Sequence, residues 1–402
     1  MAQKIITRTI WILSLVSLFT DMASEMLYPI MPIFLRSIGF SFFLIGVLEG
    51  MAEATAGISK SYFGRKSDNS GKRLPFVQLG YMLSAISKPM MAAFIYPLWI
   101  FFARTTDRLG KGVRTAARDA MLSEESTNAN KGKVFGFHRS MDTLGAVLGP
   151  AIALAFLYFY PGRYKLLFLI AFIPGIVAVG STFFLREKRK IPLPEEERQP
   201  VKFFAIFGYL KSSNYAYKKL LTGLLLFALF NSSDVFLLLK MKAGGLSDAG
   251  VIGVYIFYNL FFAAFAYPVG ILADKIGIKK IFLAGLIIFS IVYAGFAINS
   301  NIYIFIALFF LYGVYASATE GVSKAWISII VNKKETATAI GTYTALQSLC
   351  TLVASSLTGF LWVTLGPLYT FLITAAATLF VFFYLTRFSI AVDPAIKVAE
   401  FE

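Results

Sequence analysis

The sequence has very little of what enzymes use for covalent and metal chemistry. It contains one cysteine, Cys350, and one histidine, His138, among 402 residues. A single cysteine excludes a disulfide within the chain, and a single histidine excludes a multi-histidine metal site. No nucleophile–base set is visible either. We therefore expect no catalytic residues, no enzyme activity, no metal and no cofactor.

Charge is also scarce. Charged residues make up 15% of the chain, against about 25% in soluble proteins, whereas hydrophobic residues make up 57%. This composition fits only a polytopic membrane protein. The formal net charge of +16 would suggest a nucleic-acid partner in a soluble protein. In a membrane protein it indicates basic loops on one side of the bilayer, and we expect no nucleic acid.

Apolar segments of spanning length recur from end to end, about twelve in all. They lie near residues 8–35, 41–62, 74–95, 98–121, 134–160, 164–185, 219–241, 248–269, 280–298, 302–328, 337–362 and 367–388. An even number puts both termini on one side. The loops on that side hold roughly 26 Lys and Arg, against roughly 5 opposite. The termini are therefore expected in the cytoplasm, in a membrane of the bacterial inner type.

One long hydrophilic stretch, Arg186 to Lys219, divides the spans into six and six. It predicts an all-α membrane protein with a bundle over residues 1–185, a cytoplasmic loop over 186–218 and a second bundle over 219–402.

The two halves look like repeats. Gly64–Arg73 and Gly270–Lys280 both read G-x-x-x-D-x-x-G followed by basic residues, after the second and the eighth span. Two further matches occur at nearly the same separation: Lys111–Ala116 with Glu320–Ala325, and Ser24-Glu25 with Ser233-Asp234. Three matches at nearly one separation indicate an internal duplication.

With these features the chain resembles the major facilitator superfamily. The loop motif is complete at Gly64, Asp68, Gly71 and Arg73, and around Asp274 its basic residues are displaced by one position. A second match, Gly145, Gly149 and Pro150, is similar to the family's G-x-x-x-G-P motif, which is commoner in antiporters; the diglycine expected after it is absent.

The resemblance implies twelve transmembrane helices in two pseudo-symmetric six-helix bundles that work by alternating access. It also implies that the first, fourth, seventh and tenth spans line a central cavity. Asp68 would pair with a nearby base and cap a helix N-terminus from the other half, which would hold the cytoplasmic side shut. Asp274 would do the same more weakly.

The fourth span carries a cationic face. Its polar residues Arg104, Asp107, Arg108, Lys111, Thr115 and Arg118 fall within an arc of about 120° on a helix, with Arg114 at the edge. Such a face in a membrane must look at protein or water, so we interpret it as one wall of a water-filled cavity. Asp107 is expected to pair with Arg104 and Lys111. Arg108 and Lys111 bind an anionic group of the substrate, or move between carboxylate partners during the cycle, or are locked to Asp21, Glu25 and Asp142 in a structural network.

Acidic residues occupy the first two spans. Asp21, Glu25 and Tyr28 share one helix face, and Pro29 leaves the carbonyl of Glu25 without its helical donor. They either bind substrate or a proton, or neutralise the fourth span. Glu49 and Glu53 in the second span either carry protons or neutralise Lys88.

The second half has fewer unmatched charges. Asn231 to Asp234 form a polar patch in the seventh span, and Glu320 and Lys324 can pair in the tenth. We expect this half to supply shape rather than charge. The candidate binding and coupling residues are Asp21, Glu25, Tyr28, Glu49, Glu53, Arg104, Asp107, Arg108, Lys111, Arg114, Asp142, Asp234, Glu320 and Lys324.

These features predict a monomeric secondary transporter whose partners are a small-molecule substrate and the lipid bilayer. No ATP-binding motif is present, so an ion gradient, with protons as the ion, must supply the energy. Surplus cations favour a small anionic or zwitterionic organic solute, such as a carboxylate metabolite or siderophore. The alternative is proton-driven export of amphipathic drugs.

Overall fold

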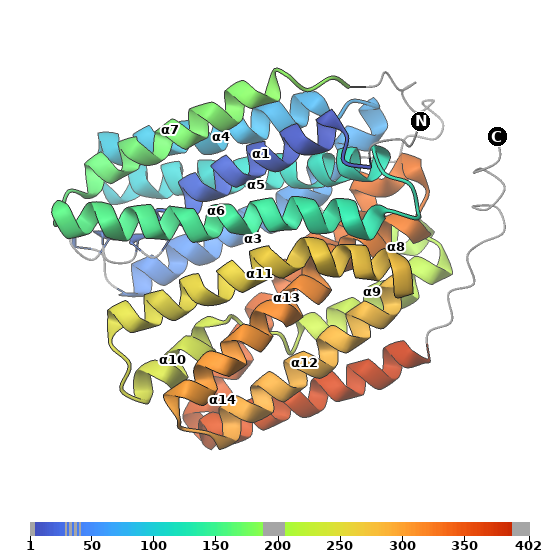
Figure 1. Ribbon diagram of the computed structural model, residues 1–402. Helices are drawn as coiled ribbons and strands as arrows, with labels where there is room; N and C mark the ends of the chain where they lie inside the picture. The colour runs from blue at the N-terminus through green and yellow to red at the C-terminus, as the bar shows by residue number, and fades with distance from the viewer. Residues whose placement is uncertain are drawn as a thin grey trace. The chain divides into compact units, whose positions relative to one another are not determined.

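A computed structural model of the chain describes residues 5–28, 30–31, 34–35, 38–39, 42–187 and 206–387. The described residues are helical, with turns between the helices (Figure 1). They form two compact units, one built mainly from the N-terminal half of the sequence and one mainly from the C-terminal half.

Unit 1 comprises residues 1–126, 141–209 and 335–345. Its helices are α1 (Arg8–Glu25), α3 (Phe42–Ser70), α4 (Leu74–Ala93), α5 (Pro97–Glu124), most of α6 (Lys131–Phe159) and α7 (Tyr164–Thr182). Within it, α5 packs against α3 and α4, and α7 packs against α1 and α4.

Unit 2 comprises residues 127–140, 210–334 and 346–402. Its helices are the end of α8 (Ile206–Ser212), α9 (Tyr215–Ala228), α10 (Val235–Ala243), α11 (Asp248–Ile276), α12 (Ile278–Ile298), α13 (Ile302–Ile330) and most of α14 (Thr336–Thr386), and a 3-10 turn, η2 (Lys333–Glu335), borders it. Both α11 and α12 run alongside α13 (Figure 1).

Each unit contains the first turns of one helix that otherwise belongs to the other unit. Residues 131–140 of α6 belong to unit 2, and residues 336–345 of α14 belong to unit 1. The boundaries expected from the sequence instead place residues 131–140 in the N-terminal bundle and residues 336–345 in the C-terminal bundle. Glycines explain the close packing: Gly136 lies against the carbonyl of Ala266, and Gly341 lies against the carbonyl of Lys60.

Six helices in the described part of the chain are long and apolar enough to cross a membrane. They are those over 131–159, 164–182, 253–276, 278–298, 302–330 and 333–386. The last is two helices joined at Gly366, whose φ of 81° and ψ of 167° break the helical path just before Pro367. This break separates the expected spans 337–362 and 367–388.

Two of the expected spans are interrupted. Regular helix α1 ends at Glu25, ahead of the prolines. The seventh span, predicted as one helix over 219–241, is instead broken between α9 and α10. The residues in the break include Asn231, Ser232, Ser233 and Asp234, whose short polar side chains compete with helical hydrogen bonds. Polar breaks of this kind occur at binding sites of transporters.

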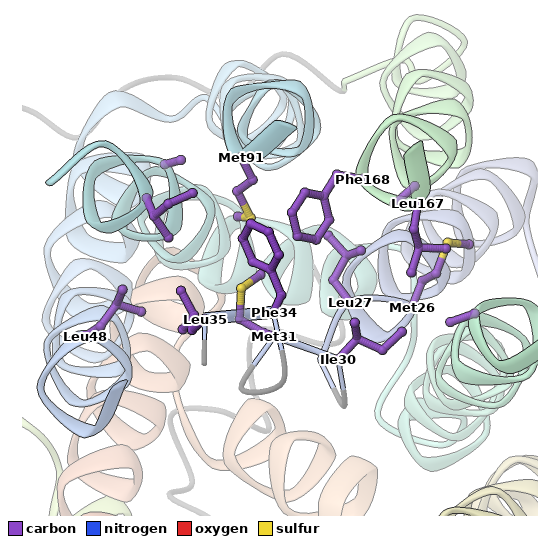
Figure 2. Packing of buried hydrophobic residues seen from close by; sticks show 14 residues of the cluster. Met26, Leu27, Ile30, Met31, Phe34, Leu35, Leu48, Met91, Leu167 and Phe168 are labelled. Carbon is purple, nitrogen blue, oxygen red and sulfur yellow. The ribbon is translucent and has the colours of Figure 1, made fainter. Parts of the chain in front are cut away.

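An apolar cluster anchors the chain that follows α1. Met26, Leu27, Ile30 and Phe34 are buried among side chains of α3, α4, α5, α6 and α7 (Figure 2). Phe34 meets Phe168 of α7 edge to face, with ring centroids 4.8 Å apart. Close packing of this kind drives helix association in a bilayer, so this cluster fixes the position of the polar residues at the end of α1.

Candidate functional site

The cationic face of α5 lies inside unit 1. Arg104, Arg108, Arg114 and Arg118 are all less than 9% exposed, and Lys111 is half-buried. Charges at this depth must be compensated by neighbouring polar groups, so their partners define what the site can do.

Asp107 is held mainly by a neighbouring helix. Lys88 of α4, which is 1% exposed, places its Nζ 2.6 Å from Oδ1 of Asp107. Arg104 lies 3.6 Å from the other oxygen, as expected for residues one turn apart. The pairing with Lys88 was not predicted from the sequence, where Lys88 was considered only with Glu49 and Glu53. The side chains of those two residues lie outside the described part of the structure.

Arg114 is fixed against α4. Its Nη1 donates to Oγ of Ser84 at 2.6 Å, and its guanidinium lies 4.7 Å from the ring centroid of Tyr81. The two helices approach closely because Gly80 and Gly110 face each other, leaving no room for a Cβ on either residue. The guanidinium of Arg114, at the edge of the cationic face, is therefore held in place against α4.

Arg118 links three helices of unit 1. Its Nε and Nη2 donate to Oδ1 of Asp119, and its Nη1 donates to Oγ of Ser17 in α1. Ser17 in turn donates to Oδ1 of Asp142 in α6. Asp142 itself lies 3.9 Å from Arg118.

Asp21 faces the same three-helix junction. Its carboxyl group interacts electrostatically with Asp142, Lys111 and Glu25. Glu25 is half-buried and Tyr28 is 43% exposed at the end of α1. The structure therefore brings together Asp21, Glu25, Lys111 and Asp142.

Gly145 and Gly149 bring α6 against α1. Gly145 lies against the carbonyl of Leu18, and Gly149 against the carbonyl of Met22. Pro150 lies inside α6 and is buried. The contacts of the G-x-x-x-G-P residues are thus helix packing contacts.

In unit 2 the candidate residues border the break in the seventh span. Asp234 accepts a 2.7 Å hydrogen bond from the hydroxyl of Tyr258, and Asn231 donates to the hydroxyl of Tyr315 at 2.9 Å. Aromatic rings lie beside these groups. The ring centroid of Tyr312 is 5.5 Å from that of Tyr258 and 5.2 Å from that of Tyr315.

Glu320 of α13 was expected to pair with Lys324 on its own helix. The structure pairs it with Arg139 of α6, whose guanidinium also lies 5.0 Å from the ring centroid of Phe262. The sequence cannot show this contact, because the residues are far apart along the chain.

The first loop motif forms a buried ionic latch, which we call latch 1. Asp68 pairs with Arg73 at 2.5 Å, and its other oxygen accepts from the backbone N–H of Thr338 at 2.6 Å and from the Thr338 hydroxyl at 2.5 Å. Thr338 lies in the first turn of α14. A carboxylate at a helix N-terminus is favoured by the helix dipole.

Further groups hold Arg73 in latch 1. Its Nε lies 3.2 Å from Glu124 at the end of α5, and its backbone N–H donates to Glu187, at the start of the loop between the halves. At the other end of that loop, Tyr209 donates to Glu335 and lies under the guanidinium of Arg65. Glu187 and Tyr209, which lie towards opposite ends of this loop, therefore contact Arg73 and Arg65 near Asp68.

Burial sets the electrostatics of latch 1, which lies beyond the expected second span. Burial raises the pKa of Asp68, and this outweighs the lowering by Arg73 and by the hydrogen bonds from Thr338. Burial lowers the pKa of Arg73, but attraction by Asp68 and Glu124 outweighs it, so that pKa is raised.

Glycines give latch 1 its shape. Gly71 has a φ of 64° and ends the turn after α3, a conformation that suits glycine. A Cβ on Gly64 would lie 2.6 Å from the carbonyl oxygen of Ala337 in α14.

The second loop motif forms a simpler contact, latch 2. Asp274 accepts from the backbone N–H groups of Gly132 and Lys133, each at 2.7 Å. These are in the first turn of α6. Latch 2 repeats the helix cap of latch 1, whereas latch 1 adds the buried Asp68–Arg73 ion pair.

The model of the Major Facilitator Superfamily matches residues 13–258 and 241–400. The chain belongs to this superfamily. It is therefore a multi-pass membrane transporter with the superfamily fold of two pseudo-symmetric six-helix bundles.

Individual relatives agree. An uncharacterized MFS-type transporter of Methanocaldococcus jannaschii is 33% identical over 379 residues, which is 91% of each chain. The human organic anion transporter MFSD10 has a similar fold, with a TM-score of 0.77 at 15% identity, covering 94% of this chain and 99% of that one. The fucose:proton symporter of E. coli has a TM-score of 0.76 at 10% identity, covering 95% and 99%.

Proposed function

We propose that this transporter couples the movement of a small anionic or zwitterionic organic solute to a proton gradient. It would do so by alternating access in the cytoplasmic membrane, as a monomer with both termini in the cytoplasm. The excess of basic residues in the loops on the side of the termini supports this orientation.

The observation that carries the proposal is the charge inside unit 1. Apart from the groups of latch 1, the charged side chains of α1, α4, α5 and the unit 1 part of α6 that are not exposed are six cations and five carboxyl groups. The cations are Lys88, Arg104, Arg108, Lys111, Arg114 and Arg118, and the carboxyl groups are those of Asp21, Glu25, Asp107, Asp119 and Asp142. A buried excess of positive charge is stabilised by an anionic ligand, and attraction is strong where water is restricted. A carboxylate solute supplies that charge.

Unit 2 offers polar and aromatic groups rather than unmatched charge. Tyr258, Tyr312, Tyr315 and Asn231 offer hydroxyl, amide and ring surfaces beside the broken seventh span. Such groups select shape and hydrogen-bonding pattern rather than net charge. The human organic anion transporter shares the fold only, so the preference for anions is argued from α5.

Thermal unfolding of the purified full-length protein tests the solute class. We would compare acetate, succinate, citrate and glutamate with two lipophilic cations, tetraphenylphosphonium and ethidium. A ligand at 100 times its Kd stabilises a protein by about 2.7 kcal/mol. We expect at least one carboxylate to raise Tm, and Arg108→Ala to remove the rise. A rise with the lipophilic cations alone would favour the alternative, drug export.

A further inference from the structure

The last turn of α14, at the red end of the ribbon in Figure 1, contacts residues near the starts of two other helices of unit 2. The hydroxyl of Tyr384 donates to the backbone carbonyl of Lys219 in α9 at 3.3 Å. The backbone carbonyl of Thr386 accepts from Nζ of Lys279 in α12 at 2.9 Å. Both lysines therefore border the same helix turn.

Positive charge gathers where these three segments meet. The segments contain six lysines and one arginine but no aspartate or glutamate; they are residues 211–222, 275–283 and 376–387. Lys219 and Lys279 also interact electrostatically, as like charges. A cation beside the C-terminal end of α14 is favoured by the helix dipole, which accounts for Lys279 but for none of the others. The remaining charge is available to an anionic ligand.

The exposed surface next to these charges is apolar. On α14, Arg387 lies on the same helix face as Phe383 and Phe380, four and seven residues earlier, and all three side chains are exposed. On α12, Lys280 is exposed on the same face as Ile287, seven residues further on. Exposed apolar side chains of membrane-spanning helices face lipid tails. Each of these two faces therefore runs from lipid tails to a cation at the helix end.

We propose that this cluster binds the phosphate group of an anionic phospholipid, in the leaflet on the side of the chain termini. The cations that hold the phosphate are Lys219, Lys279, Lys280 and Arg387. The acyl chains lie along the exposed apolar faces of α12 and α14. A phospholipid fits this surface better than a soluble phosphate, because only a lipid uses both the cations and the apolar faces.

Native mass spectrometry of the full-length protein, titrated with phosphatidylglycerol in detergent, measures the affinity. One lysine or arginine near an anionic lipid changes binding by about fivefold. We therefore expect Lys280→Gln/Arg387→Gln to bind phosphatidylglycerol about 30-fold more weakly than the wild type. Both side chains are exposed, so the protein should fold normally. Phosphatidylcholine, which has no net charge, should bind the two proteins equally weakly.

Two matched controls separate this site from a general effect of charge. Lys280→Arg/Arg387→Lys keeps both charges and should bind phosphatidylglycerol like the wild type. Arg163→Gln/Lys165→Gln removes two exposed cations beside the start of α7, in the other leaflet, and should also leave the affinity unchanged.

A phosphatidylglycerol with a photoreactive group in its acyl chains tests the location. In lipid nanodiscs we expect it to label peptides that contain Ile287, Phe380 or Phe383 more than a photoreactive phosphatidylcholine does. Lys280→Gln/Arg387→Gln should remove this excess of labelling.

Equal affinity for the two lipids, or an unchanged affinity in Lys280→Gln/Arg387→Gln, overturns the proposal. Displacement of phosphatidylglycerol by inorganic phosphate would assign the cations to a soluble anion and overturns it as well. If the double variant does not fold, Lys280→Gln alone decides, with an expected loss of about fivefold. No transported solute is present in these experiments, so their failure leaves the proposed function untouched.

Discussion

Latch 1 and latch 2 perform the same helix-capping interaction with different amounts of charge. Asp68 caps α14 and also forms a buried ion pair with Arg73, which Glu124 and Glu187 support. Asp274 caps α6 through two backbone N–H groups. The comparison teaches that the repeated element is the cap, whereas the ion pair is an addition in the first half.

Neutralising the two aspartates should give the largest difference. In Asp68→Asn the amide can still accept from Thr338, but Arg73 stays buried beside a neutral group, and breaking such a pair costs about 3 kcal/mol. Asp274→Asn should cost about 1 kcal/mol, since only charge assistance and a dipole interaction are lost. Denaturant titration in mixed micelles measures both. Equal costs would mean that the ion pair adds nothing.

Latch 1 should also control opening more strongly than latch 2. We expect Asp68→Asn to trap the protein toward the inward-facing state. Ser61→Cys in a Cys350→Ser background provides the thiol that is labelled. Ser61 is 4% exposed in this structure, so labelling at this position reports opening. A shift of 1.4 kcal/mol toward the open state raises labelling about tenfold. Asp274→Asn in the same background should raise it less. Unchanged labelling in Asp68→Asn would remove the gating role.

The packing of the two latches, unlike their charge, should be equivalent. A Cβ on Gly64 would lie 2.6 Å from the carbonyl oxygen of Ala337, and one on Gly132 would lie 2.6 Å from Oδ1 of Asp274. Overpacking of this kind costs about 1–3 kcal/mol. Gly64→Ala and Gly132→Ala should therefore lower Tm by similar amounts. A large effect from only one of them would show that the two crossings differ in more than charge.

The smallest effect is expected where the loop between the halves joins latch 1. Glu187→Gln keeps an oxygen that accepts from the backbone N–H of Arg73 and loses only charge, which is worth about 0.5 kcal/mol on a half-buried group. Glu187→Ala should cost about 1 kcal/mol. Tm of the two variants distinguishes them, and identical values would show that the contact is not formed in solution.

Much of this architecture could be predicted from local sequence. The twelve-span, all-α organisation followed from apolar length. The missing N–H group of Pro29 predicted a weakened helix at Glu25, whereas the end of α1 at Glu25 was not predicted. The capping role of Asp68 came from the family resemblance, because only the motif links it to a helix start elsewhere in the chain.

Long-range pairing could not be predicted in this way. Lys88 was recognised as a charge in an apolar span that requires an acid, but spacing alone could not choose Asp107 as that acid. The sequence likewise could not reveal the pairing of Arg139 with Glu320. The break in the seventh span could have been predicted, since Asn231 to Asp234 are poor helix formers.

The most direct test is transport by the full-length protein in liposomes, inside acidic or alkaline relative to the bath, with radiolabelled succinate, citrate and glutamate. We expect at least one of these carboxylates to accumulate against its own gradient when the pH gradient is imposed. We also expect a protonophore, or Asp21→Asn at a candidate coupling residue of α1, to abolish the accumulation. Movement of tetraphenylphosphonium against its gradient, with none of the carboxylates moving, would contradict this expectation.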